Sequence, residues 1–222
     1  MTQILTYTSP LIKNIQSRFN YGERWNYLEI KGKELFGPTF NFHPSEEEII
    51  IKLIIWFFKD EQASEQFNID LRKGILLSGP VGCGKTTIMK LFKSIMKFND
   101  KHYIYSCREI AFEYAHYGHQ VFNRYTRSAF HRPEIGQSPI PICFDDLGSE
   151  PAVQFYGNSC NPMSEILFSR YDYFTSCGMI THITTNCAAS LIECKYGIRV
   201  RSRIREMMNI ISFKDDTKDK RV

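Results

Sequence analysis

Apolar residues in this chain come in short runs that end in polar residues, a pattern typical of strands buried on both faces of a parallel sheet. We expect strands at residues 74–78, 102–106, 139–146, 179–186 and 209–213. Segments with helical spacing or turn residues separate these runs. The alternation predicts an α/β fold, with a five-stranded, mostly parallel sheet flanked by helices.

The intervening helices are expected at residues 45–60, 87–98, 108–130, 163–175, 188–195 and 199–208. Ser45 followed by Glu48 resembles a capping box and predicts a helix start there. Residues 1–40 contain Gly22, Gly32 and Gly37, and we interpret them as a short, turn-rich N-terminal extension. The α/β core is therefore expected to span residues 41–222.

A glycine-rich loop follows the first strand and precedes a helix. Its sequence, GPVGCGKT at residues 79–86, matches the phosphate-binding pattern G-x-x-x-x-G-K-[ST]. Glycines let backbone N–H groups close around phosphate oxygens, and the helix start adds partial positive charge. Lys85 is expected to reach the β- and γ-phosphates, and the Thr86 hydroxyl to bind Mg²⁺. The expected nucleotide-binding residues are Gly79, Pro80, Val81, Gly82, Cys83, Gly84, Lys85, Thr86 and Thr87.

Two further strands end in polar residues that suit the same chemistry. Asp145 and Asp146 close the third strand, and Asn186 closes the fourth. Because ligands of parallel sheets bind at the carboxyl ends of the strands, we expect all three beside the phosphate loop. Asp145 is the candidate second Mg²⁺ ligand, with Thr86, and Asp146 the candidate for orienting water. Asn186 is interpreted either as a γ-phosphate contact or as a cap of the next helix.

Charge is informative only in its distribution, because the net charge is a mild +4. Residues 195–205 contain five basic residues and no acidic one. If this segment is helical, Arg199 and Arg203 share one face and Arg201 and Arg205 lie nearly opposite. A planar guanidinium suits the γ-phosphate charge in a neighbouring subunit's site.

Residues 108–132 interleave four arginines with aromatic residues. Such a segment suits single-stranded nucleic acid, because cations follow the backbone and rings stack on bases. Aromatic side chains at helical spacing also suit a protein core, and this alternative stays open for the rings.

The cysteines and the apolar runs indicate where in the cell the protein is expected. The seven cysteines form no C-x-x-C pair, so zinc-ligand spacing is absent and their usage fits a reducing cytoplasm. The apolar run at residues 49–58 is too short to span a bilayer, which needs about 20 residues. We therefore expect a cytoplasmic protein that does not enter a membrane.

Taken together, four motifs resemble the AAA+ ATPases of the DnaC/IstB group, which are bacterial helicase loaders and transposition accessory proteins. They are GPVGCGKT, CFDDLG, ITTN and YGIRVRSRIREM, in that order along residues 40–213. The resemblance implies a P-loop fold without a lid domain. It implies ATP and Mg²⁺ bound at subunit junctions of a homo-oligomer, with single-stranded DNA in the centre.

By motif, the resemblance assigns Asp145 and Asp146 as the acidic pair and Asn186 as the polar sensor. It assigns Arg203 as an arginine finger acting in trans and Arg199 as its companion. It implies a slow ATPase that loads a replicative helicase onto DNA during replication. Two alternatives stay open: an ATPase that assists a transposase, and a nucleotide-dependent DNA-binding adaptor whose hydrolysis is incidental.

Overall fold

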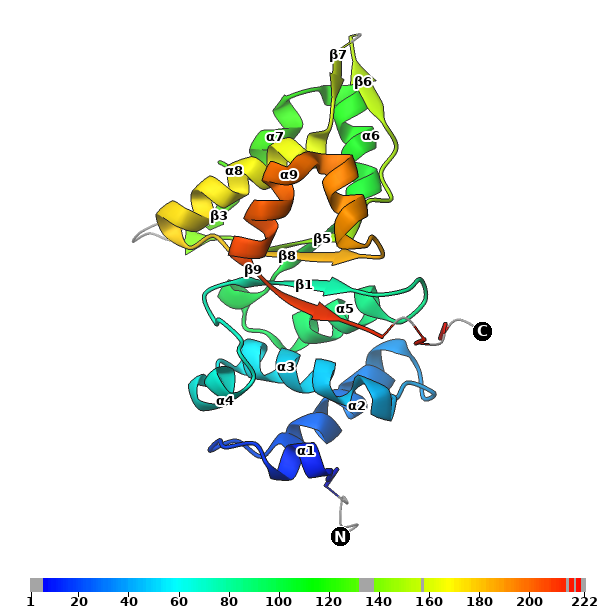
Figure 1. The fold of residues 1–222 in the computed structure, drawn as a ribbon, viewed down its shortest axis with the longest axis vertical. Coiled ribbons are helices and arrows are strands. Elements are labelled where there is room, and N and C mark those ends of the chain that lie inside the picture. Colours follow the sequence, from blue (N-terminus) through cyan, green and yellow to red (C-terminus); the bar gives the residue numbers. More distant parts are fainter. Residues whose placement is uncertain (1–5, 132–137, 157, 215, 218, 221–222) are drawn as a thin grey trace. The chain divides into compact units, whose positions relative to one another are not determined.

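The computed structural model divides the chain into two compact units, Met1–Leu71 and Arg72–Val222 (Figure 1). It describes residues 6–131, 138–156, 158–214, 216–217 and 219–220. No helix within these residues is long and apolar enough to cross a bilayer. The first unit includes a helix that the sequence analysis assigned to the core, so the division at residue 40 stays a prediction.

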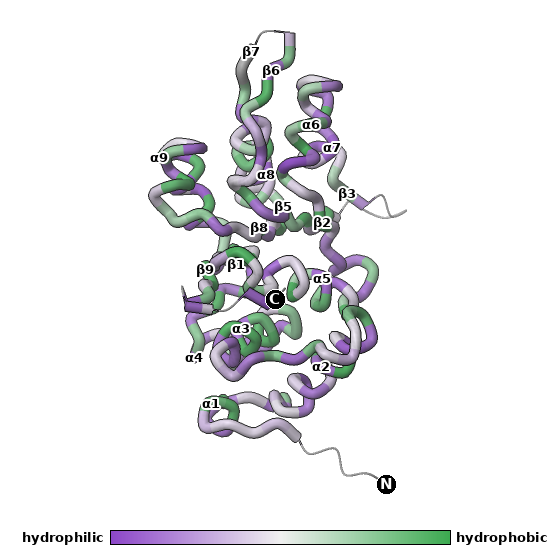
Figure 2. Tube along the Cα trace, turned by 90° about the vertical axis from the view of Figure 1, so that its right-hand side faces the viewer, coloured by the Kyte–Doolittle hydropathy of each residue, from purple (hydrophilic) through white to green (hydrophobic). Residues whose placement is uncertain are grey.

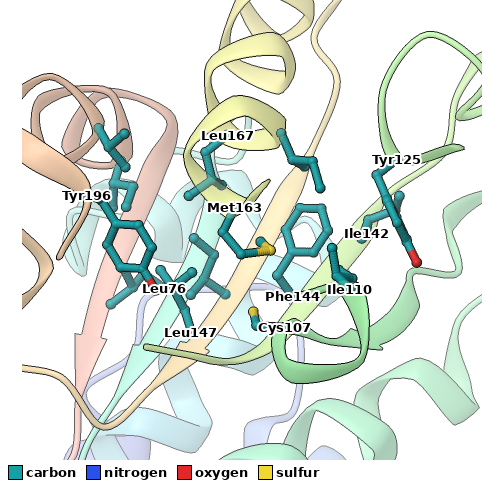
Figure 3. Close-up of a cluster of buried hydrophobic side chains, with 14 of the residues drawn as sticks. Leu76, Cys107, Ile110, Tyr125, Ile142, Phe144, Leu147, Met163, Leu167 and Tyr196 are labelled. Atoms are coloured by element: carbon teal, nitrogen blue, oxygen red, sulfur yellow. The ribbon is translucent and has the colours of Figure 1, made fainter. Parts of the chain in front are cut away.

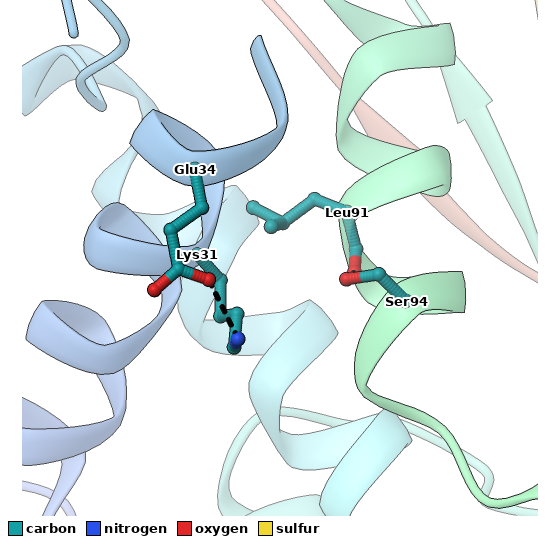
Figure 4. Close-up of polar contacts among 4 residues, drawn as sticks. All are labelled: Lys31, Glu34, Leu91 and Ser94. Carbon is teal, nitrogen blue, oxygen red and sulfur yellow. Dashed lines mark hydrogen bonds and ion pairs between the residues drawn. The ribbon is translucent and has the colours of Figure 1, made fainter. Parts of the chain in front are cut away.

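The first unit is helical. Its elements are α1 (Pro10–Lys13), α2 (Tyr21–Phe36), the short 3-10 helix η1 (Pro44–Glu46), α3 (Glu47–Phe58) and α4 (Glu61–Gln66). Apolar residues run along most of α3, which is largely buried (Figure 2). The exposed side of α2 carries an ion pair between Lys31 and Glu34, 2.6 Å long (Figure 4).

Helix α2 was not expected, because glycines in residues 1–40 were interpreted as turn residues. Gly22 and Gly32 lie inside the helix and are buried. A β-carbon on Gly32 would lie 2.1 Å from the ring of Phe40, and one on Gly22 would lie 2.2 Å from the carbonyl oxygen of Tyr7. These glycines therefore serve close packing rather than chain reversal.

The predicted capping box before α3 is formed by different residues. The backbone N–H of His43 donates to Glu46 Oε2 at 2.8 Å, and the His43 ring accepts from the N–H of Ser45. The chain enters α3 through η1, whose capping residue is His43, two residues before Ser45. Glu48, the expected partner of Ser45, instead pairs with Lys52 one turn later.

The second unit is built on the expected five-stranded sheet. Its strand order is β2-β5-β8-β1-β9, and every pairing is parallel. The strands are β1 (Gly74–Ser78), β2 (Tyr103–Ser106), β5 (Ile142–Leu147), β8 (Thr181–Thr185) and β9 (Met208–Ser212). The predicted α/β fold class is confirmed.

Helices cover both faces of this sheet (Figure 1). Helix α5 (Lys85–Ile95) lies on one face, and Ser94 Oγ closes one of its turns by donating to the carbonyl of Leu91 at 2.6 Å (Figure 4). The other face carries α6 (Cys107–Tyr117), α7 (Gln120–Tyr125), α8 (Pro162–Cys177) and α9 (Ala189–Met207). Between them and the strands lies a buried hydrophobic cluster that includes Phe144, Met163 and Leu167 (Figure 3).

Small elements complete the unit. They are the 3-10 helix η2 (Phe98–Asp100), the strand pair β3 (Phe130–His131) and β4 (Ser138–Pro139), and the hairpin β6 (Val153–Phe155) and β7 (Asn158–Cys160). Gly118, with φ 63°, ends α6 within the predicted long helix. Gly197, with φ 84°, breaks α9 into the two helical pieces that the sequence predicted.

Candidate nucleotide site

The phosphate loop connects β1 to α5 in the expected way. Gly82 and Gly84 have φ values of 80° and 96°, which residues with a side chain rarely adopt. Gly84 is the N-cap of α5 and has no side chain with which to cap it. The first-turn amides of α5 are thus directed at the loop, an arrangement that suits a phosphate group.

Lys85, the first residue of α5, turns its side chain back over the loop. Its Nζ donates to the carbonyl oxygens of Gly79 and Pro80, both at 2.8 Å. The lysine is only 8% exposed. Its ammonium group therefore sits at the loop, where the motif requires the positive charge.

The side chains of Thr86 and Asp145 meet across two elements. Thr86 Oγ1 on α5 donates to Asp145 Oδ1 at the end of β5, with a separation of 2.8 Å. Thr184 on the neighbouring strand β8 donates to the same oxygen at 2.7 Å. The structure brings the two predicted Mg²⁺ ligands together, and it adds Thr184 as a third member that the sequence analysis missed.

Asp146 owes its position to a local irregularity. The pairing of β5 with β8 shifts register between Phe144 and Leu147, and Asp146 adopts a left-handed conformation with φ 60°. Its backbone N–H donates to Thr184 Oγ1 at 2.8 Å. Bulges of this kind re-aim side chains beside active sites, and Asp is among the residues that tolerate a left-handed backbone. The bulge therefore lies at the acidic pair itself.

These residues fit a magnesium ion and a phosphate chain. Adjacent ligands of an octahedral Mg²⁺ lie about 2.9 Å apart when each bond is about 2.1 Å long. The 2.8 Å between Thr86 Oγ1 and Asp145 Oδ1 matches that spacing. Both atoms are oxygens, which Mg²⁺ prefers. Thr86 and Asp145 would hold the ion, and Lys85 with the loop amides would hold the phosphates.

Asn186 lies beside the loop, in a cavity of about 460 Å³. Thr185, just before it, is tied to the loop because its carbonyl oxygen accepts from the N–H of Gly79 at 3.2 Å. Asn186 itself is exposed. Residues that line the cavity include Gly79, Pro80, Asn186, Ile204, Arg201 and Arg205. The structure thus places the predicted sensor at the same strand edge as the phosphate loop.

The arginines of α9 divide between two environments. Arg201 lines the cavity and forms an ion pair with Glu193. The guanidinium carbon of Arg203 lies 4.5 Å from the ring centre of Phe168 and 4.8 Å from that of Tyr171, both on α8. The predicted finger and its companion Arg199, which is exposed, therefore do not line the cavity beside their own loop.

The aromatic and basic segment over α6 and α7 is partly core and partly surface. Tyr114 and Tyr125 are fully buried, whereas Phe112 and Tyr117 are more than half exposed. Arg124 pairs with Glu113 at 3.0 Å. Arg108 and Arg127 are exposed, and Arg132 lies outside the described residues. The core interpretation is confirmed for the two buried rings, whereas nucleic-acid binding by the exposed ones stays a prediction.

The cysteines carry no sign of redox chemistry. All seven are free. Burial raises the pKa of the Cys107 and Cys143 thiols, so both stay protonated at neutral pH. Cys83, inside the phosphate loop, is also fully buried. These cysteines pack as small apolar groups.

Comparison with known proteins gives a fold and no sequence relative. No family model and no curated protein matches the chain. The crystal structure of the DnaC helicase loader matches with a TM-score of 0.53 and 20% identity, over 80% of this chain and 95% of that chain. The crystal structure of DnaI matches with a TM-score of 0.52 and 18% identity, over 81% and 90%. The chain therefore shares its fold with the DnaC helicase loader and with DnaI.

Proposed function

We propose that this chain is an ATPase that binds ATP with Mg²⁺ at the loop of residues 79–86. The observation that carries the proposal is the contact of Thr86 with Asp145, 2.8 Å long, beside the buried ammonium of Lys85. A turn that binds nothing gives no reason for a lysine, a hydroxyl and a carboxylate from two separate elements to meet at a glycine loop. In P-loop enzymes these groups hold the phosphates and the metal ion.

In this proposal each side chain has a separate task. Lys85 binds the β- and γ-phosphate oxygens, and Thr86 and Asp145 hold the ion. Asp146, at the bulge in β5, orients the attacking water, and Asn186 contacts the γ-phosphate or that water. Bound Mg²⁺ neutralises the charge that develops on the phosphates.

Hydrolysis is proposed to need a second subunit. Arg203 lies on the α8 rings rather than in the cavity beside its own loop, which supports a role in a neighbour's site. The fold shared with the DnaC helicase loader supports the same assembly, with single-stranded DNA as ligand and a replicative helicase as protein partner.

The test of this function has two arms. The rate of ATP hydrolysis per subunit should rise with protein concentration and with added single-stranded DNA. A pull-down with the host's replicative helicase should recover the chain with ATP more strongly than without it. Hydrolysis that depends on neither variable would contradict the assembly, and recovery with a transposase instead of the helicase would assign the chain to the transposition alternative.

A further inference from the structure

Described residues that follow β9 contact the phosphate loop at two places. The N–H of Phe213 donates to the carbonyl of Ser78 at 2.8 Å, which continues the pairing of β9 with β1. The side chain of Phe213 then covers Gly79, because a β-carbon there would lie 2.6 Å from Phe213 Cβ. The chain therefore leaves the sheet at the start of the loop.

Further along, the segment contacts the middle of the loop directly. The N–H of Lys220 donates to the carbonyl oxygen of Gly82 at 3.1 Å. The Asp219 carboxyl group lies against the same glycine, since a β-carbon on Gly82 would meet its Cγ and Oδ1 at 2.0 Å. The space beside Gly82 is thus filled by a carboxylate from the chain itself.

A carboxylate at this position has an electrostatic reason to stay. Backbone amides of a glycine loop, a helix start and the Lys85 ammonium all attract an anion. Asp219 supplies two oxygens and one negative charge. The triphosphate of ATP supplies more oxygens and more charge, so ATP can displace the carboxylate. The segment follows β9 by a few residues only, so its effective concentration at the loop is high, on the order of millimolar.

We propose that the segment around Asp219 and Lys220 is an internal competitor that occupies the phosphate loop and must leave before a nucleotide binds. This inference rests on the proposed function, because it concerns access to the same loop. The competitor sets a threshold for nucleotide binding, because ATP binds only when the ATP concentration is sufficient to displace the carboxylate. If the segment occupies the loop in about nine molecules of ten, the apparent affinity for ATP is about tenfold weaker than without it.

The test measures the affinity of purified chain for a fluorescent ATP analogue in the presence of Mg²⁺. Asp219→Asn and Asp219→Ala should bind about three- to tenfold more tightly than the wild type. Asp216→Asn is the matched control: both aspartates are exposed, and the substitution removes the same charge from the same segment but leaves the Asp219 carboxylate against Gly82. Its affinity for the analogue should stay within about twofold of wild type, because salt screens the effect of an exposed charge on the bound nucleotide.

Hydrogen exchange provides a second measurement that does not depend on mutation. The Lys220 amide should exchange faster when the analogue is bound, because the nucleotide breaks its hydrogen bond to Gly82. If the wild type binds the analogue while the Asp219 variants bind no better and the exchange is unchanged, the inference is wrong and the proposed function stands. If neither the wild type nor the variants bind, both fail.

Discussion

At the scale of single residues, Thr184 connects the two aspartates of the acidic pair through hydrogen bonds. Its hydroxyl donates to Asp145 Oδ1 and accepts from the N–H of Asp146, at 2.7 and 2.8 Å. The side chain is 1% exposed. One buried hydroxyl thus hydrogen-bonds both the carboxylate that would hold Mg²⁺ and the backbone of Asp146 at the bulge.

Thr184→Val should lower both stability and ATP hydrolysis. Valine keeps the shape but leaves the Asp146 amide without its acceptor, and a buried group left unsatisfied costs about 1–3 kcal/mol of unfolding free energy. Urea unfolding and Mg²⁺-dependent ATPase rates give the two readouts. Thr184→Ser keeps the hydroxyl and is the control. A valine variant as stable and as active as the serine variant would show that Thr184 does not organise the pair.

His102 is a second residue whose burial has a measurable consequence. Desolvation lowers its pKa from 6.5 to about 4. Between these values the unfolded chain binds a proton that the folded chain does not, so stability rises with pH across this window and is lost as pH falls. At about 1.4 kcal/mol for each pH unit, the loss between pH 6.5 and 5 is about 2 kcal/mol.

Urea unfolding at pH 6.5 and pH 5 checks this dependence. His102→Gln keeps an amide that can donate to the carbonyl of Met89, which the His102 ring contacts at 3.1 Å, and it does not titrate. The glutamine variant should therefore lose about 2 kcal/mol less than the wild type over this range. Equal losses in the two proteins would mean that other groups cause the acid sensitivity.

At the scale of elements, the strands could be predicted because each one is a short apolar run with a polar end. The burial of β1, β5 and β8 on both faces produces that pattern directly. The phosphate loop is a local motif, and it was predicted for the same reason. Asp145 and Asn186 could be placed nearby because parallel strands end at one edge.

The elements and contacts that were not predicted from the sequence also have physical reasons. Helix α2 contains Gly22 and Gly32, and sequence alone does not distinguish a packing glycine from a turn glycine. The hairpin of β6 and β7 has strands of three residues, which are too short to show a two-residue alternation of apolar and polar positions. Thr184 was missed because its partners lie on another strand, and the contact of Asp219 with Gly82 joins residues far apart in the chain.

Helix α9 carries the prediction about catalysis between subunits. Arg203→Ala should leave ATP binding nearly unchanged and cut hydrolysis, by about 10³- to 10⁵-fold where the finger stabilises the transition state. Lys85→Ala subunits should also be inactive alone. A mixture of the two should regain activity, because some junctions pair an intact loop with an intact arginine.

The control for this experiment keeps the number of intact loops constant. Arg203→Ala subunits are mixed with subunits that carry both Lys85→Ala and Arg203→Ala, and this mixture has no intact arginine to donate. Activity should return only with the single Lys85→Ala partner. If neither mixture recovers activity, Arg203 acts within its own subunit or has no catalytic role.

At the scale of the whole molecule, DNA binding is expected to follow the exposed arginines of the segment over α6 and α7. Replacing Arg108 and Arg127 with Ala should weaken binding to single strands and reduce the magnitude of the salt slope by about 1.4, which corresponds to two lost phosphate contacts. Fluorescence anisotropy at several salt concentrations gives both values.

Arg124→Ala is the control within the same segment, because Glu113 already neutralises this side chain. Its slope should change less than that of the double variant. If the double variant binds with the same affinity and slope as the wild type, the segment has only a structural role. DNA contact would then have to be sought on another surface.

Calorimetric titration of the whole chain with ATP and Mg²⁺ shows whether the phosphate loop binds ATP. We expect one ATP per chain in the wild type. Lys85→Ala should weaken binding by about 10- to 150-fold, since hydrogen bonds to charged groups are worth about 1.5–3 kcal/mol. Lys90→Ala, on an exposed position of the same helix, should bind like the wild type. Equal affinity in Lys85→Ala and wild type would contradict the account.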